Sequence, residues 1–171
     1  MGKQNFGGTF LEKYVKNAGE VQEFLAKQHG DSFDASSSLL ISDLYSASLL
    51  VRHDIEKELL MKYKLSWTAM LMMYTLWVFG PSETRIIAQR LQVAPSSVTS
   101  LTNTLEKKGL VFRSYKPLDR RLVLVNLTDT GVDLLKVLSK EVNEREQVHT
   151  SKLTKEEVDV FNRLLHKLLN K

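Results

Sequence analysis

The segment 82–127 constrains the fold of this chain more than any other part of the sequence. It contains two short helical patterns, at 83–91 and 95–108, which are joined by only three residues. We expect Ser82 to cap the first of these helices. Pro95 occupies the first position of the second, where its missing N–H group costs nothing. Two helices with so short a junction predict a helix-turn-helix unit.

A β-hairpin with a basic tip is expected directly after these helices. The segments 110–115 and 121–127 are rich in Leu and Val, and residues 116–120 join them. The segment 82–127 carries eight Lys or Arg and three Asp or Glu, a net charge of +5, whereas the rest of the chain has a net charge of −1. Positive charge concentrated on a helix-turn-helix and a hairpin is typical of a winged helix that binds nucleic acid.

The remainder of the chain is predicted to be helical. Apolar residues recur at helical spacing over 9–29, 39–64, 67–79 and in the two segments that follow Thr128 and Thr154. Ser66, Thr128 and Thr154 are expected to cap the helices that they precede. The expected fold class is therefore mainly α: a winged helix-turn-helix with a small β-hairpin wing, plus N- and C-terminal helices.

A homodimer is expected because the first, second and last helices carry more apolar surface than a small winged helix can cover. We divide the chain into an N-terminal helical extension at 1–35, dimerisation helices at 36–65 and 129–171, and a winged-helix DNA-binding region at 66–128. The helix at 9–29 is expected to pack on the dimer region, and a disordered arm is the alternative.

Composition excludes several classes of protein. The chain has 171 residues, 43% of them hydrophobic, and no cysteine, so disulfides, thiolate zinc sites and thiol-based redox switches are absent. Its four histidines show no metal-ligand spacing, and we expect neither a metal site nor a cofactor. No nucleophile elbow or phosphate-binding glycine loop is present, so we do not expect an enzyme.

A cytoplasmic location is expected. The first eight residues lack the apolar run of a signal peptide. The strongest apolar run, at 69–79, is far shorter than the roughly 20 residues that span a bilayer. We therefore expect no membrane partner.

The second short helix has an apolar and a polar side. Val98, Leu101 and Leu105 form the predicted buried stripe. The opposite side carries short hydroxyl and amide side chains and one lysine, namely Ser96, Ser97, Thr99, Ser100, Asn103, Thr104 and Lys107. Such side chains reach base edges and phosphates in a major groove, and a helix N-terminus attracts phosphate. The alternative is an ordinary solvated helix surface.

The tip of the hairpin carries Asp119, Arg120 and Arg121. Two guanidinium groups at the end of a short arm suit a minor groove, whose negative potential attracts arginine. The carboxylate of Asp119 can hold one of them. The alternative is an exposed turn with ordinary charges.

Three stretches together resemble the MarR-type winged-helix regulators: 105–111 (LEKKGLV), 117–121 (PLDRR) and 127–131 (LTDTG). The resemblance covers roughly residues 39–169. It implies a homodimer that binds a pseudo-palindromic operator in double-stranded DNA, with 95–108 as the recognition helix. Arg121 matches the minor-groove arginine of the family's wing, steadied by Asp119.

Some positions depart from the family pattern. Members often carry basic residues where this chain has Ser100 and Thr104. We therefore expect this helix to anchor phosphates more weakly, or the phosphate contacts to move to Lys107, Arg113 and Lys116. An acidic residue usually stands where this chain has Lys116, and glycine is frequent at the position of Gln92. Because of these departures, the resemblance does not predict a particular operator sequence for this chain.

The family resemblance also implies a small-molecule effector, commonly a phenolic or other aromatic anion, bound between the dimerisation helices and the winged helix. The candidate residues are Arg52, His53, Trp67, Met70 and Tyr74, with Met73 and Trp77 beside them. Plain core packing is the alternative for the Met and aromatic stripe. Arg52 and His53 can equally be solvated or paired across a dimer.

We expect a sequence-specific DNA-binding transcriptional regulator, a repressor whose affinity changes when a small ligand binds. The alternative is a winged-helix dimer that binds protein and no longer reads DNA. The missing basic residues at Ser100 and Thr104 favour this alternative, whereas the local charge of +5 and the basic wing oppose it.

Overall fold

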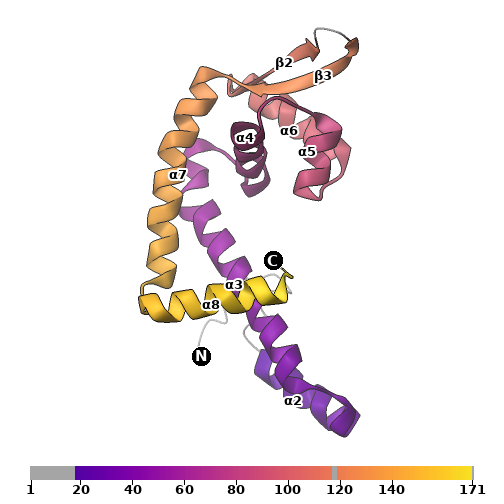
Figure 1. The fold of residues 1–171 in the computed structure, drawn as a ribbon, viewed down its shortest axis with the longest axis vertical. Coiled ribbons are helices and arrows are strands. Elements are labelled where there is room, and N and C mark those ends of the chain that lie inside the picture. Colours follow the sequence, from indigo (N-terminus) through magenta and orange to yellow (C-terminus); the bar gives the residue numbers. More distant parts are fainter. Residues whose placement is uncertain (1–17, 117–118, 171) are drawn as a thin grey trace, which may run out of the picture. The chain divides into compact units, whose positions relative to one another are not determined.

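The computed structural model describes residues 18–116 and 119–170, apart from the side chains of Ala18, Asp31, Lys116 and residues 119–122. The described residues fall into two compact units, which divide between Asp54 and Ile55. Helices make up most of the described residues, and one small sheet accompanies them (Figure 1). The expected mainly α fold with a winged helix-turn-helix is confirmed.

The first unit contains helix α2 (Ala18–His29), the 3-10 turn η1 (Gly30–Ser32) and most of helix α3 (Ala35–Glu58). A helix was expected over 9–29; α2 accounts for its second half, and residues 9–17 lie outside the described part of the chain. The hydroxyl of Ser38 donates to the side-chain oxygen of Gln22 at 2.9 Å. This hydrogen bond joins α3 to α2.

Helix α3 begins four residues before the predicted start at 39 and ends six residues before the predicted end at 64. Asp34 explains the early start, because its carboxylate accepts hydrogen bonds from the hydroxyl of Ser37 at 2.6 Å and from the backbone N–H of Ser37 at 3.1 Å. These bonds lower the pKa of Asp34. The early end leads into a 3-10 turn, η2 (Leu60–Tyr63), which Lys64 closes in the left-handed conformation (φ 53°).

Helix α4 (Trp67–Phe79) is the centre of the second unit. The hydroxyl of Ser66 accepts a hydrogen bond from the backbone N–H of Ala69, and Gly80 ends the helix at φ 75°, as predicted. The α4 side chains that are at most 3% exposed are Met70, Met72, Met73 and Leu76. Helix α4 contacts α5, α6, α7 and strand β3, so its apolar surface organises the core of this unit.

The helix-turn-helix consists of α5 (Thr84–Leu91) and α6 (Pro95–Lys107). Gln92 adopts the left-handed conformation (φ 53°) in the turn, and its N–H bonds back to the carbonyls at the end of α5. The prediction that Ser82 caps α5 is wrong. Ser82 lies in strand β1 (Ser82–Glu83) and pairs with Val125, so the position next to α5 falls to Glu83, whose side chain makes no capping bond.

Strand β1 was not predicted, and it completes a three-stranded antiparallel sheet in the order β1-β3-β2. The hairpin is formed by β2 (Val111–Lys116) and β3 (Asp119–Leu127), with Val111 opposite Leu127 and Lys116 opposite Asp119. Both strands reach further toward the tip than expected. Residues 117–118, which join them, lie outside the described part of the chain.

Helices α7 (Asp129–Thr150) and α8 (Lys155–Leu168) follow the hairpin. Thr128 caps α7, and Thr154 forms a capping box with Glu157, as predicted. The predicted inner stripe of α7 is buried: Gly131, Leu135, Leu138 and Val142. Helix α8 buries no residue within one chain, although Phe161 and Leu168 belong to its predicted apolar stripe.

Among the described residues, no helix has the length and the apolar composition that a membrane crossing requires.

Candidate nucleic-acid interface

The outer face of α6 is the first part of the candidate interface. The structure exposes all seven side chains that the sequence assigned to this face: Ser96, Ser97, Thr99, Ser100, Asn103, Thr104 and Lys107. On the inner face, Val98, Thr102 and Leu105 are fully buried. The predicted inner residue Leu101 is only half-buried. Thr102 takes its place because its hydroxyl donates to the carbonyl of Val98 at 2.7 Å, which removes the cost of burying it.

Two hydroxyl groups on the outer face of α6 are already used as donors. Thr99 donates to the carbonyl of Pro95 at 3.1 Å, and Thr104 donates to the carbonyl of Ser100 at 3.0 Å. An outside partner therefore meets the methyl group and the oxygen lone pairs of each threonine. These side chains are suited to accept a hydrogen bond from a base amino group or to contact a thymine methyl group.

A cluster of three polar side chains links α6 to the first strand of the hairpin. The guanidinium of Arg113 forms an ion pair with the carboxylate of Glu106, and it donates to the side-chain oxygen of Asn103 at 2.6 Å. Glu106 also accepts a hydrogen bond from the backbone N–H of Arg113 at 3.2 Å. Sequence reasoning missed the role of Glu106, although its acidic charge in a basic segment was a visible signal.

Other basic side chains of the segment 82–127 also have partners within the protein. The ammonium group of Lys108 donates to the carbonyls of Tyr63 at 3.2 Å and Lys64 at 2.7 Å. The guanidinium of Arg90 lies 4.1 Å from the centre of the Phe79 ring. Lys107, in contrast, is exposed on α6.

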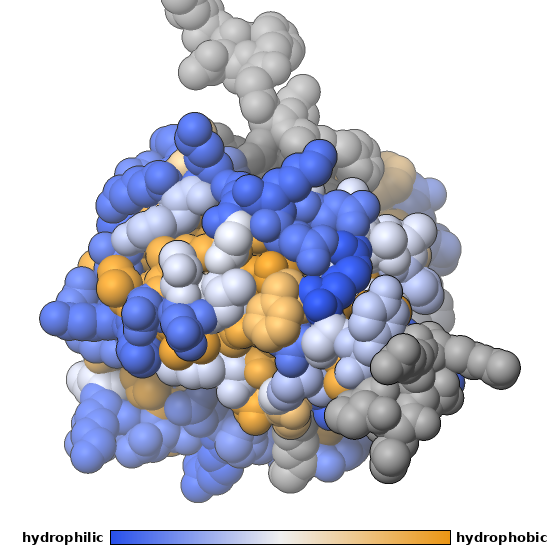
Figure 2. Space-filling view, turned by 90° about the horizontal axis from the view of Figure 1, so that it is seen from above, coloured by the Kyte–Doolittle hydropathy of each residue, from blue (hydrophilic) through white to orange (hydrophobic). Residues whose placement is uncertain are grey.

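The hairpin carries the second part of the candidate interface. Its backbone places Lys116 opposite Asp119 at the outer end of the strands, with Arg120 and Arg121 next along β3. The side chains of these four residues lie outside the described part of the structure, so the expected contact between Asp119 and Arg121 stays a prediction. Figure 2 views the molecule from above, which is the end where Figure 1 draws the hairpin, and it shows hydrophilic residues bordering a hydrophobic region.

The predicted ligand residues fall in both units of the chain. Arg52 and His53 belong to the first unit, and Trp67, Met70 and Tyr74 belong to the second, so a shared pocket stays a prediction. Met70 is only 2% exposed, as a core residue would be. Burial, together with the charge of Glu146, raises the pKa of Tyr74.

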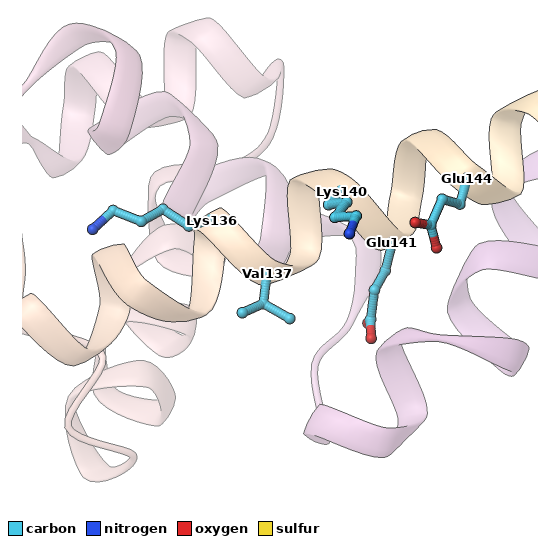
Figure 3. A pocket seen from close by; sticks show the side chains of 5 residues that line it. All are labelled: Lys136, Val137, Lys140, Glu141 and Glu144. Carbon is cyan, nitrogen blue, oxygen red and sulfur yellow. The ribbon is translucent and has the colours of Figure 1, made fainter.

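A surface pocket of about 460 Å³ lies along α7. Its lining side chains project from successive turns of this one helix (Figure 3): Lys136, Val137, Lys140, Glu141 and Glu144. None of them is among the predicted ligand residues. With walls from a single helix, the pocket is a shallow feature of the surface.

Comparisons with known proteins agree with this architecture. The sequence model of the MarR family matches residues 65–123, which run from the start of α4 into β3. The HTH-type transcriptional regulator YwaE of Bacillus subtilis is 34% identical over 138 residues, which is 81% of each chain. The reduced form of MarR from E. coli has a TM-score of 0.68 at 23% identity, covering 74% of this chain and 93% of that one.

A second solved structure has the same fold. The organohalide-sensing regulator RdhR, in its 2,4-dichlorophenol-bound form, has a TM-score of 0.68 at 21% identity. The match covers 78% of this chain and 79% of the RdhR chain. At 21% identity, this similarity shows that the two proteins share a fold.

Proposed function

Because the chain belongs to the MarR family of transcriptional regulators, we propose that it represses transcription by binding a pseudo-palindromic operator as a homodimer. Helix α6 enters the major groove, and the β2–β3 hairpin reaches the adjacent minor groove. The observation that carries this proposal is the exposed hydroxyl and amide face of α6 beside a hairpin with a basic tip. The protein is a cytoplasmic binding protein and not an enzyme.

The DNA contacts are divided between the two elements. Hydroxyl and amide groups on α6 contact base edges and phosphates, and Lys107 neutralises a phosphate. Arg120 and Arg121 enter the minor groove, where Asp119 steadies Arg121. Lys116 contacts a phosphate of the DNA backbone. Arg113 of β2 is the remaining basic residue for which the sequence suggested a phosphate contact.

Homodimer formation is supported by the apolar surface of α8. The most exposed large apolar side chains of this helix are Phe161, 51% exposed, and Leu164, 56% exposed. Residues 36–65 and 129–171 act as the dimerisation helices, 66–128 bind DNA, and 1–35 pack on the dimer region. Two half-sites about 34–36 Å apart would then be bound by one dimer.

A small aromatic or anionic effector is the proposed signal. The bound dichlorophenol in the similar fold of RdhR supports this class of ligand. Arg52 and His53 would supply charge and hydrogen bonds, and Trp67, Met70 and Tyr74 would supply apolar contacts. Binding of such a ligand shifts the dimer between arrangements that differ in DNA affinity.

The test is duplex selection from random DNA followed by gel shifts at fixed salt. We expect Arg121→Ala to weaken binding to the selected duplex by at least about tenfold, since it removes a minor-groove contact. Lys152→Ala is the matched control, because it also removes one positive charge but lies outside the segment 82–127. Equal binding by the Arg121 variant and the parent would contradict the proposed role of the wing.

The same experiment distinguishes the protein-interaction alternative. If no duplex is enriched, and retention on heparin disappears at moderate salt, the winged helix contacts polyanions without reading sequence. Adding a panel of aromatic acids to the gel shifts tests the effector, which should release the selected duplex.

A further inference from the structure

Asn103 lies on the exposed face of α6, and its side-chain oxygen accepts a hydrogen bond from within the protein. The guanidinium of Arg113 donates to this oxygen at 2.6 Å. A guanidinium has only donors, so the oxygen of the amide, and not its nitrogen, must face Arg113. The two hydrogens on the Asn103 nitrogen are left to meet an outside partner.

Arg113 is itself held in place from two directions. Glu106, one turn after Asn103 on α6, pairs with its guanidinium and accepts a hydrogen bond from its backbone N–H at 3.2 Å. The side chain of Arg113 is only 31% exposed, and that of Glu106 is 38% exposed. A partly buried, charge-assisted pair of this kind keeps the donor to Asn103 in one position.

This arrangement changes what Asn103 can recognise. An asparagine with both polar atoms free forms a bidentate pair with adenine, since adenine presents an acceptor at N7 beside an amino donor. Because this hydrogen bond turns the amide oxygen toward Arg113 and takes one of its two lone pairs, Asn103 presents mainly the hydrogens of its nitrogen to an outside partner. Guanine presents two adjacent acceptors, N7 and O6, and therefore matches it, whereas the adenine amino group would face a second donor.

We propose that Arg113 is a positioning residue that sets the base preference of Asn103 to guanine. The inference rests on the proposed function, since it concerns the same helix in a major groove. It assigns Arg113 a role in specificity in place of the phosphate contact that the sequence suggested. Glu106 supports this role by holding Arg113.

Duplex selection from random DNA with the parent and three variants tests the proposal. The parent should enrich guanine at one position of each half-site, and Asn103→Ala should lose selectivity at that position alone. Arg113→Met frees the amide oxygen, so the preference should shift from guanine toward adenine. Lys107→Met is the matched control: it also removes a charge next to this cluster, and it should weaken binding while guanine is retained.

A base analogue gives a second test that does not depend on the folding of the Arg113 variant. Replacing the selected guanine by 7-deazaguanine removes the N7 acceptor. This change should weaken binding by the parent about tenfold and leave binding by Asn103→Ala nearly unchanged. An equal loss for both proteins would overturn the assignment of Asn103.

The outcomes also separate this inference from the proposed function. If the parent enriches no duplex, the proposed function fails. If it enriches a duplex in which the position lost by Asn103→Ala is adenine, or if Arg113→Met keeps guanine unchanged, DNA binding stands and the positioning role of Arg113 is wrong.

Discussion

Individual basic residues of the segment 82–127 differ in what they can offer to DNA. Lys108 donates to two backbone carbonyls, Arg90 lies over the Phe79 ring, and Arg113 pairs with Glu106. A charge held by a partner within the protein contributes less to an outside contact than a solvated one. The local net charge of +5 therefore overstates the charge that is available for phosphate binding.

Gly131 illustrates a residue whose lack of a side chain is required. A Cβ atom at this position would lie well inside contact distance of the Leu110 carbonyl oxygen, which belongs to the backbone and accepts a hydrogen bond from Thr128. We expect Gly131→Ala to lower the free energy of unfolding by about 1–3 kcal/mol, measured by chemical denaturation. In Gly19→Ala, where nothing lies within 4 Å, stability should be unchanged or slightly higher. A Gly131 variant as stable as the parent would contradict this contact.

Tyr63 provides a prediction about alkaline pH. Burial, together with the hydrogen bond that its hydroxyl donates to Glu141 at 3.0 Å, raises the pKa of Tyr63 above the ordinary 10.0. Above pH 10 the phenol ionises in the unfolded chain before it does so in the folded one, so stability falls as the pH rises through this window. Tyr63→Phe should show a shallower loss of unfolding free energy above pH 10. If both proteins lose stability at the same rate, the phenol of Tyr63 is not responsible.

At the scale of elements, α6 and the hairpin are joined as one surface. Glu106 and Asn103 of α6 hold Arg113 of β2, and Thr128 at the end of β3 donates to the carbonyl of Gly109 at 2.6 Å. Strand β1 pairs with the other edge of β3 through Ser82 and Glu83. The helix and the wing are therefore held in a fixed relation, as simultaneous contacts with two grooves require.

Neighbouring lysines at the end of α6 give a prediction about salt dependence. Lys107 is exposed, whereas Lys108 donates to the carbonyls of Tyr63 and Lys64. We expect Lys107→Gln to reduce the slope of log K against log salt concentration by about 1, since one phosphate contact is lost. Lys108→Gln should leave the slope unchanged and lower thermal stability instead. The reverse result would mean that Lys108 is the phosphate contact.

At the scale of the whole molecule, the chain leaves a large apolar surface uncovered. Helix α8 has a capping box and an amphipathic pattern, yet it buries no residue within a single chain. Phe161, Leu164 and Leu168 are each about half exposed, at 51%, 56% and 48%. A helix with such a stripe is stabilised mainly by packing against a partner, which supports a second copy of this chain.

The proposed dimer gives a prediction about mass in solution. The parent should show twice the chain mass of 19.6 kDa in light scattering. The double variant Phe161→Asp and Leu164→Asp should show the single-chain mass, because two carboxylates cannot be buried in an apolar interface. Val78→Asp is the control: this α4 residue is 69% exposed, and the variant should remain dimeric. A dimeric double variant would exclude α8 from the interface.

Most elements could be predicted because their signals are local. Caps at Ser66, Thr128 and Thr154 and the proline at 95 mark helix starts through bonds within one turn. The misassignments arose where distant residues compete. Ser82 was expected to cap a helix, but it pairs with Val125 in a strand too short to have a pattern of its own. Leu101 was expected in the buried stripe of α6 and is only half-buried, whereas Thr102, which was assigned to neither face, is buried because its hydroxyl bonds within its own helix.

By itself, the sequence determined the class of fold, the order of the helices and the hairpin, and the outer face of α6, because periodicity and capping depend on residues a few positions apart. Only the tertiary structure decided which basic side chains are engaged and which polar atom of Asn103 faces Arg113. Both depend on contacts between residues of different elements, such as α6 and β2. The distance and direction between two side chains, and not the residue types alone, determine whether they form a hydrogen bond.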